Sequence, residues 1–197
     1  MVHGFSVIKY YITNMIEPAA GILLIAHPFL KDPNFLRTVV LVCEHQEGGS
    51  FGFVLNKQIE QTLGELVSGL EGYSLPVYYG GPVQVDSIHF LHQYPELIPE
   101  SVKVSGNIFW GGNFETVAVL LKNKSIDLNK IKFFIGYSGW GNNQLLAELE
   151  EKSWLTVSAN LKLVFNTDYT EIWKGSLKEL GGEYEMMVNY PIDPQLN

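Results

Sequence analysis

The stretch GILLIAHPFLKDPNFLRTVVLVCEHQEGGSFGFVLN, from Gly21 to Asn56, decides the fold of this chain. It holds two unbroken apolar runs, Ile22 to Ala26 and Thr38 to Cys43. Continuous runs of this length, closed by turn residues, are typical of strands buried on both faces. Gly48-Gly49 tolerates positive φ, so we predict a hairpin turn there and a returning strand over Phe51 to Leu55.

Shorter strand and helix patterns follow this stretch. Strand patterns cover residues 76–79, 87–92, 102–104 and 131–135, and helix patterns cover 62–70, 114–121, 142–152, 161–165 and 172–180. Thr62 and Glu65 have the spacing of a capping box, Asn113 is a good N-cap, and residues 10–16 suggest one more helical face. The mixture predicts an α+β (mixed α/β) fold in a single domain, residues 1–197, with an N-terminal extension at 1–20 and a C-terminal tail at 181–197.

Composition and charge disfavour several classes of function. The net charge of −8 disfavours duplex DNA as a partner, because nonspecific DNA binding depends on lysine and arginine neutralising phosphates. No basic recognition helix is visible either. Cys43 is the single cysteine, so an internal disulfide is ruled out and a reducing, cytoplasmic location is expected. We find no signal peptide, and no run approaches the roughly 18 apolar residues of a membrane span, so no membrane contact is expected.

Several spaced motifs extend beyond the opening stretch. They are Tyr79-Gly80-Gly81-Pro82-Val83, Leu91-His92, Gly136-Tyr137-Ser138-Gly139-Trp140-Gly141, Gln144-Leu145, Trp154-Leu155 and Trp173. Together with the opening stretch, their order resembles the AlgH/YqgE family of bacterial proteins. The resemblance implies a strongly bent, mainly antiparallel, barrel-like sheet with helices packed around it. It also implies a regulatory role, since some members are described as transcriptional regulators.

The chain departs from the family pattern at a few positions. His27 stands where an apolar residue is expected, Lys57 where arginine is usual and Ser138 where alanine is usual. The C-terminus carries Asn189-Tyr190-Pro191 rather than a Gly-His-Ala type of ending. A role of the family's C-terminal histidine therefore cannot be carried over to this chain.

The segment from Gly136 to Gly141 is the first candidate site. A buried strand, then three glycines, then a helix start can point backbone N–H groups at an anion. However, no Gly-Lys-Ser/Thr follows, the segment holds no basic residue, and the G-x-G-x-x-G spacing is missing. The alternative is a tight connection between strand and helix, with Trp140 packed over it.

Cys43, Glu44 and His45 form the second candidate. Cys43 and His45 would share one face of a strand, and an imidazole that reaches a thiol lowers the thiol pKa and activates it. Residues two apart on a strand stand about 7 Å from each other, so the alternative is an inert, buried thiol. For Glu44, on the opposite apolar face, we predict a half-buried ion pair with Arg37.

The sequence offers no spacing that indicates a metal site or a bound cofactor, and we expect neither. The histidines, apart from His3, are His27, His45, His89 and His92. They show no H-x-x-H or H-E-x-x-H spacing and have no cysteine pair beside them. The nearest approach to a basic patch is made by Lys122, Lys124, Lys130 and Lys132. A solvated helix end and loop would explain those lysines equally well.

We predict one binding site, where three segments would meet. Its residues are Gly80, Gly81, Pro82, His92, Gly136, Tyr137, Gly139, Trp140, Gly141, Asn142 and Gln144. Trp140 would supply apolar contact, His92 a group that titrates near neutral pH, and the amides of residues 142–144 hydrogen bonds. The alternative is that these glycines serve tight turns at separate places.

Two functions stay open from the sequence. One is a non-enzymatic binding or regulatory protein that contacts an unidentified protein or small molecule, which the lack of catalytic spacings favours. The other is an enzyme, or a binder of small ligands such as anions, that uses the glycine segments and His92.

Overall fold

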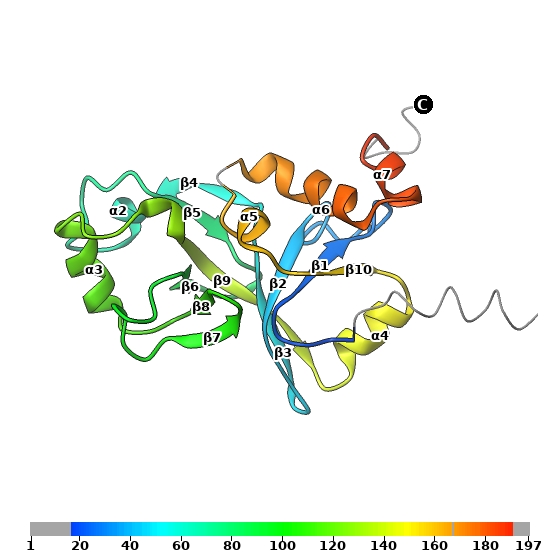
Figure 1. Ribbon diagram of the computed structural model, residues 1–197, viewed down its shortest axis with the longest axis horizontal. Helices are drawn as coiled ribbons and strands as arrows, with labels where there is room; N and C mark the ends of the chain where they lie inside the picture. The colour runs from blue at the N-terminus through cyan, green and yellow to red at the C-terminus, as the bar shows by residue number, and fades with distance from the viewer. Residues whose placement is uncertain (1–16, 167, 191–197) are drawn as a thin grey trace, which may run out of the picture.

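One long strand, β9 (Ile131–Gly141), holds the sheet together because it pairs with three other strands. In the computed structural model, which describes residues 17–166 and 168–190, its C-terminal end runs antiparallel to β3 (Gly49–Val54). The rest of β9 runs antiparallel to β6 (Val83–His92) and parallel to β5 (Pro76–Tyr79). Figure 1 shows β9 joining the half of the molecule that holds β5 to β8 with the half that holds β1 and β10.

The remaining strands extend the sheet on either side of β9. They are β1 (Ile22–Ala26), β2 (Val39–Gln46), β4 (Gln58–Thr62), β7 (Val102–Ser105), β8 (Ile108–Trp110) and β10 (Trp154–Ser158). The strand order is β10-β1-β2-β3-β9-β6-β8-β7, with β4 attached through β5. The strands predicted at 22–26 and 76–79 are confirmed, and so is the hairpin, which turns through Glu47 and Gly48 between β2 and β3.

The sheet bends where β9 changes partners. Gly136 adopts φ +64° inside the strand, a conformation that glycine reaches without strain, and a Cβ there would meet the Gly81 carbonyl oxygen at 2.5 Å. A Cβ at Gly80 would likewise meet the Gly136 carbonyl oxygen at 2.3 Å. The glycines therefore let two backbones touch while the strand kinks. The predicted fold class, a mixed α/β protein with a strongly bent and mainly antiparallel sheet, is confirmed.

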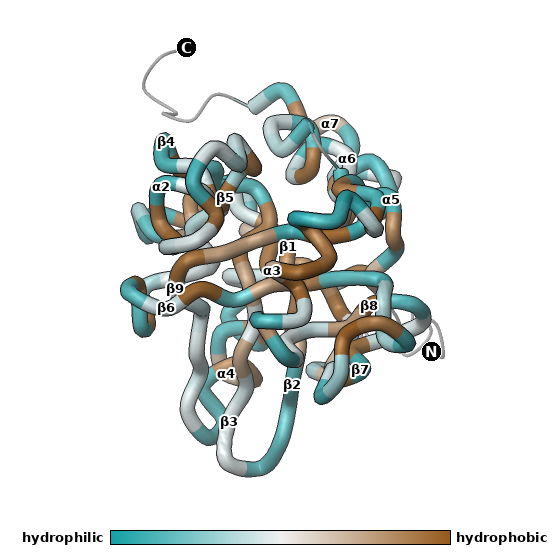
Figure 2. The backbone as a smooth tube through the Cα atoms, turned by 90° about the vertical axis from the view of Figure 1, so that its left-hand side faces the viewer, coloured by the Kyte–Doolittle hydropathy of each residue, from teal (hydrophilic) through white to brown (hydrophobic). Residues whose placement is uncertain are grey.

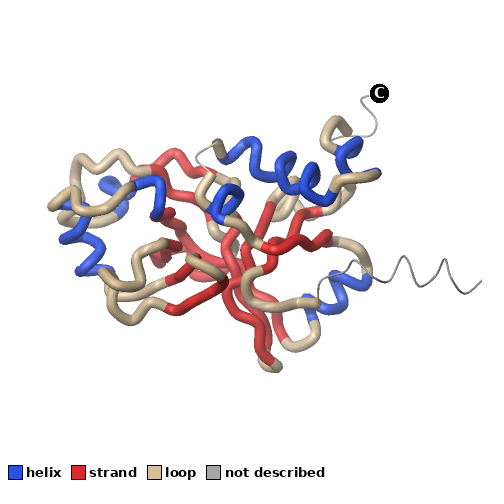
Figure 3. Tube along the Cα trace, viewed as in Figure 1, coloured by secondary structure: helices blue, strands red, loops and turns tan. Residues whose placement is uncertain are grey.

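Short helices pack around the curved sheet (Figure 3). They are α2 (Leu63–Leu66), α3 (Phe114–Lys122), α4 (Gln144–Glu150), α5 (Leu161–Val164), α6 (Ile172–Leu180) and α7 (Glu183–Met187), with the 3₁₀ turns η1 (Leu128–Lys130) and η2 (Tyr169–Glu171). Helices α5 and α6 bury one face of the β1–β3 region, and α4 buries the other. Helices α2 and α3 close a third core over β5, β6 and the start of β9.

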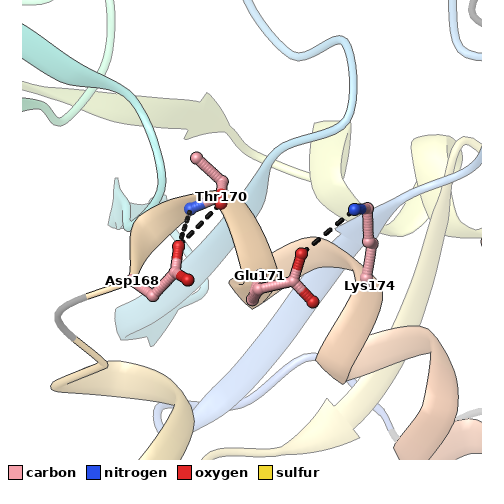
Figure 4. Close-up of polar contacts among 4 residues, drawn as sticks. All are labelled: Asp168, Thr170, Glu171 and Lys174. Carbon is pink, nitrogen blue, oxygen red and sulfur yellow. Dashed lines mark hydrogen bonds and ion pairs between the residues drawn. The ribbon is translucent and has the colours of Figure 1, made fainter.

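Local polar contacts fix the start of α6 (Figure 4). The Asp168 carboxylate accepts hydrogen bonds from the Thr170 backbone N–H and hydroxyl, at 3.2 and 2.6 Å, which begins η2. One turn later, Lys174 Nζ lies 3.0 Å from Glu171 Oε1. The position of α6 on the sheet is set by its buried side chains Ile172, Trp173 and Leu177.

Several predicted boundaries are wrong. The helix predicted at 62–70 ends at Leu66, because Val67 is extended, although Glu65 does accept hydrogen bonds from the Thr62 N–H and hydroxyl. The helix predicted from residue 142 begins at Gln144. Strands β4, β8 and β10 were not predicted, and α7 lies inside the predicted C-terminal tail. The helical face predicted for residues 10–16 lies outside the described residues.

Candidate functional site

A β-bulge at Cys43 re-aims the end of β2. The pairing of β2 with β3 skips Cys43, because its neighbours Val42 and Glu44 face consecutive residues of β3. Cys43 stays in the apolar core at 2% exposure, whereas His45 is carried to the opposite face and pairs with Ser50. The prediction that Cys43 and His45 share a face is therefore wrong, because one extra residue shifts every side chain after it.

A hollow of about 560 Å³ opens between the β2–β3 hairpin and the start of α4. We call it the hairpin hollow, and it is lined by Pro18, His45, Gln46, Glu47, Gly49, Ser50, Gly141, Asn142, Asn143, Leu145 and Leu146. Figure 2 shows the hairpin projecting at the bottom of the molecule, with α4 nearby. The volume falls within the range of small-ligand sites, which is roughly 300–1,000 Å³.

Uncharged hydrogen-bonding groups dominate the hairpin hollow. His45 Nδ1 lies 2.7 Å from Ser50 Oγ across the two strands. Asn142 and Asn143 are exposed, and Asn143 has φ +57°, a left-handed conformation that asparagine tolerates better than most residues. Among the described lining residues none is lysine or arginine, and Glu47 adds negative charge. The hollow is therefore better suited to neutral polar groups than to anions.

A carboxylate fixes the wall of the hairpin hollow. Glu148 Oε2 accepts hydrogen bonds from the indole N–H groups of Trp140, at 2.9 Å, and Trp154, at 2.7 Å. Its other oxygen accepts from the Gln144 amide at 3.0 Å, and Gln144 in turn accepts from the Gly141 N–H at 3.0 Å. This chain of contacts ties α4 to β9 and β10, so the hollow has a rigid side.

A second, more open hollow of about 460 Å³ lies on the other face of the hairpin. Tyr137, Gly139 and Trp140 contribute to its lining. The predicted site residues in and just after β9 are therefore not in one place: these three line the second hollow, Gly141 and Asn142 line the hairpin hollow, and Gly136 lines neither. Gln144 supports the hairpin hollow from behind through its bond to Gly141.

The structure brings Gly80 and Gly81 against β9 but builds no anion site from them. The Gly80 carbonyl oxygen accepts from the Val54 N–H at 2.9 Å and from the Ser138 hydroxyl at 3.0 Å. The segment Gly136 to Gly141, predicted as a loop between a strand and a helix, is the second half of β9. Its backbone pairs with β3 and β6, so these glycines serve close packing. Pro82 follows Gly81 in the turn that leads into β6.

His92 lies far from Trp140 and lines neither the hairpin hollow nor the second hollow. It pairs with Ile131 at the beginning of β9, whereas Trp140 is nine residues further along the strand, about 30 Å away for an extended strand. Its side chain is fully buried: Nδ1 accepts from the Tyr94 N–H at 3.0 Å, and Nε2 lies 3.1 Å from the Gly111 carbonyl oxygen. The predicted meeting of His92 with Trp140 is wrong, because β9 separates them.

Arg37 and Glu44 do not form the predicted ion pair. Arg37 precedes β2 and Glu44 lies near the other end of the strand, and the ion pair found among the described residues is Lys174–Glu171. The Arg37 guanidinium instead lies 4.9 Å from the Trp173 ring and donates to the Tyr190 carbonyl oxygen. Glu44 accepts from the Gln46 amide. The prediction failed because it relied on nearness in sequence, whereas an extended strand places residues at its two ends far from each other in space.

Lys132 is a residue whose environment the sequence did not reveal. It was grouped with three lysines that could be solvated, yet its side chain is 5% exposed. Burial lowers the pKa of this amine to about 7. A signal was present, because Lys132 interrupts the apolar run Ile131 to Ile135 and a strand between two layers buries both faces.

The described residues contain no cluster of three or more His, Cys, Asp and Glu side chains that could hold a metal ion. Nor does any helix within them have the length and apolar character needed to cross a membrane.

Comparisons with known proteins agree with the fold. A family model described as AlgH-like matches residues 23–185. A UPF0301 protein of Chlorobium limicola is 42% identical over 177 residues, which is 90% of this chain and 95% of that protein. A UPF0301 protein of Cytophaga hutchinsonii is 39% identical over 178 residues, which is 90% of this chain and 98% of that protein.

Two solved structures resemble the chain. The solution structure of the AlgH protein from Pseudomonas aeruginosa matches with a TM-score of 0.69 and 28% identity, over 87% of this chain and 94% of that one. The crystal structure of a protein from Corynebacterium diphtheriae matches with a TM-score of 0.75 and 18% identity, over 92% and 97% of the two chains.

Proposed function

The chain belongs to the AlgH-like family, and we propose that it is a non-enzymatic binding protein that holds an extended, uncharged segment of a partner protein in the hairpin hollow. The observation that carries the proposal is the pairing of neutral hydrogen-bonding groups with apolar ones in a single hollow. Ser50 and Asn142 supply the first kind, and Leu146 supplies the second.

The chemistry of the hollow fits a peptide. Amide side chains such as those of Asn142 and Asn143 can donate to a backbone carbonyl and accept from a backbone N–H at once. Leu146 is 45% exposed, so one apolar side chain of the partner would gain contact with it. The Glu148 contacts hold this wall in place before binding, which reduces the entropy lost on association.

Charge supports a protein partner over nucleic acid. The net charge of −8 opposes duplex DNA, and the described lining of the hairpin hollow holds no lysine or arginine. Regulation through such a contact, in the cytoplasm, is part of the proposal. The single cysteine, Cys43, is buried and free, which is compatible with a reducing compartment.

The test uses a photo-crosslinking amino acid at position 146 in the full chain, produced in cells. The matched control places the same amino acid at Val119, which is 54% exposed on α3 and outside the hairpin hollow. We expect a discrete adduct from position 146 that disappears when Asn142→Ala is added. A peptide from the crosslinked region of the partner should then bind the purified protein, and Leu146→Asp should weaken it at least tenfold.

Three outcomes contradict this function. Position 146 and position 119 could give the same adducts, position 146 could give none, or Asn142→Ala could leave its adduct unchanged. Melting temperatures of all variants should stay close to that of the unmodified chain, since the changed side chains are exposed.

The contact between His45 and Ser50 favours a second candidate function, a hydrolase with Ser50 as nucleophile. The 2.7 Å distance between Nδ1 and Oγ suits proton transfer from the hydroxyl to the ring. We rank it second because, among the described residues, no contact ties a carboxylate to the His45 ring to orient it. Labelling of Ser50 by a fluorophosphonate probe, abolished by His45→Ala, would favour the hydrolase. Absence of Ser50 labelling at millimolar concentrations of the probe would exclude the hydrolase function.

A further inference from the structure

The side chain of Lys132 enters the core from β9 on the side of α5. Lys132 pairs with Leu91 of β6, which is fully buried, and the following residues of β9 are Phe133 and Phe134. Lys132 is only 5% exposed, although lysine is among the residues that are hardly ever fully buried without a partner. Such placement costs free energy and invites a functional explanation.

The amine has weak hydrogen-bonding partners. Nζ lies 3.5 Å from the Val164 carbonyl oxygen and 3.4 Å from that of Asn166, both long compared with the usual distance of about 2.9 Å. It also lies 4.1 Å from the centre of the Tyr78 ring. Within the described part of the chain no carboxylate forms an ion pair with it. Little therefore compensates a full positive charge at this position.

A small cavity of about 50 Å³ is lined by Lys132. Its other walls are mainly apolar and include Tyr78, Phe133, Phe165 and Leu128. A water molecule needs roughly 10–15 Å³ of such space, so the cavity has room for only a few heavy atoms. An apolar pocket of this size favours a small neutral molecule over a hydrated ion.

The fraction of Lys132 that carries a neutral amine decides whether this side chain can act as a nucleophile. Burial lowers the pKa of Lys132 to about 7, while the face of the Tyr78 ring and the two carbonyl oxygens favour the charged form and limit that effect. An exposed lysine with pKa about 10.4 is neutral in only about one molecule in a thousand at pH 7.4. Even a partial shift gives Lys132 a larger neutral, nucleophilic fraction than an exposed lysine has.

We propose that Lys132 is a covalent binding site for small apolar aldehydes, which it holds as an imine within this cavity. The nitrogen lone pair attacks the carbonyl carbon and one amine proton is transferred to the carbonyl oxygen, which gives a carbinolamine. The hydroxyl group then leaves as water together with the second amine proton, and the carbon–nitrogen double bond forms. Amine and aldehyde are converted to imine and water, so no oxidant or reductant is required. The site is separate from the hairpin hollow and independent of the proposed function.

The test traps the imine by reduction. The folded full chain is incubated with propanal at pH 7.4, reduced with cyanoborohydride and mapped by mass spectrometry. We expect Lys132 to carry the propyl group at least tenfold more than Lys103 and Lys124, which are exposed and serve as internal controls. The preference should fall as the pH rises toward 10.5, where a lysine side chain in water is largely neutral. In urea all lysines should react alike.

Two variants distinguish a specific site from general reactivity. Lys132→Arg should remove labelling at this position and leave Lys103 unchanged. Leu128→Trp, at a wall residue that is 48% exposed, should narrow access and reduce labelling of Lys132 by propanal. Labelling of Lys132 no faster than of the exposed lysines would overturn the proposal, as would equal labelling by propanal and by a naphthaldehyde that the cavity cannot hold.

Discussion

The indole Nε1 of Trp154 lies 2.7 Å from Oε2 of Glu148, the same carboxylate oxygen that accepts a hydrogen bond from Trp140. The two rings meet edge to face, with centroids 6.2 Å apart. One acidic side chain on α4 thereby satisfies two indole N–H groups from different strands, and this couples the helix to the sheet beside the hairpin hollow.

The first prediction concerns Glu148. Glu148→Ala leaves both indole N–H groups without their acceptor, and we expect the free energy of unfolding to fall by about 2–4 kcal/mol. Glu148→Gln keeps one acceptor oxygen and should lose less. Urea unfolding measures the change, with Glu150→Ala, at an exposed position of the same helix, as the control. Equal effects of Glu148→Ala and Glu150→Ala would show that the network adds nothing to stability.

The second prediction concerns Trp140, which the sequence suggested as a ligand contact. Trp140 is 5% exposed and packs with Leu145, Leu149 and Trp154. We therefore expect Trp140→Ala to destabilise the protein by about 3–5 kcal/mol, as for other large side chains removed from a core. Thermal unfolding checks this against Leu146→Ala at an exposed position. An unchanged melting temperature would contradict a packing role and would favour Trp140 as a residue that contacts the ligand.

The third prediction concerns His92 and pH. Burial lowers the pKa of His92 below 6.5, and the hydrogen bond to Gly111 opposes this in part. The unfolded chain then binds more protons than the folded one, so this stabilisation is complete above about pH 6.5 and is lost as the pH falls through the folded-state pKa. In His92→Gln the loss of stability between pH 7 and pH 5 should shrink.

Urea titrations at the two pH values measure that loss. Burial also lowers the pKa of His89 and His27, so His89→Gln serves as the comparison. An unchanged pH dependence in His92→Gln would mean that the other histidines account for it.

The fourth prediction is that Cys43 is unreactive in the folded protein. Burial raises its pKa well above the usual value, and the neighbouring charge of Glu44 adds to this effect. Since the thiolate is the reactive form, labelling by a thiol reagent should be slower than for a free cysteine peptide and should become fast in urea. Faster labelling of the native protein than of the peptide would refute the assignment.

The sequence by itself determined the main strands, their hairpin and the family. The runs at 22–26 and 38–43 identify buried strands because hydrophobic periodicity is local. The glycine motifs singled out Gly80, Gly81 and Gly136, and in the structure Gly81 and Gly136 have positive φ while Gly80 lies against the Gly136 backbone. The sequence could not show whether the glycines bind a ligand through their backbone or let two strands pack closely, since both arrangements require a residue without a side chain.

Only the tertiary structure decided which residues share a site. The bulge at Cys43 moves His45 to the face of Ser50, and a single skipped residue leaves no mark in the hydrophobic pattern. The length of β9 separates His92 from Trp140, while α5 closes over Lys132. Pairing register and helix placement are set by contacts between residues far apart in sequence, and local periodicity carries no information about them.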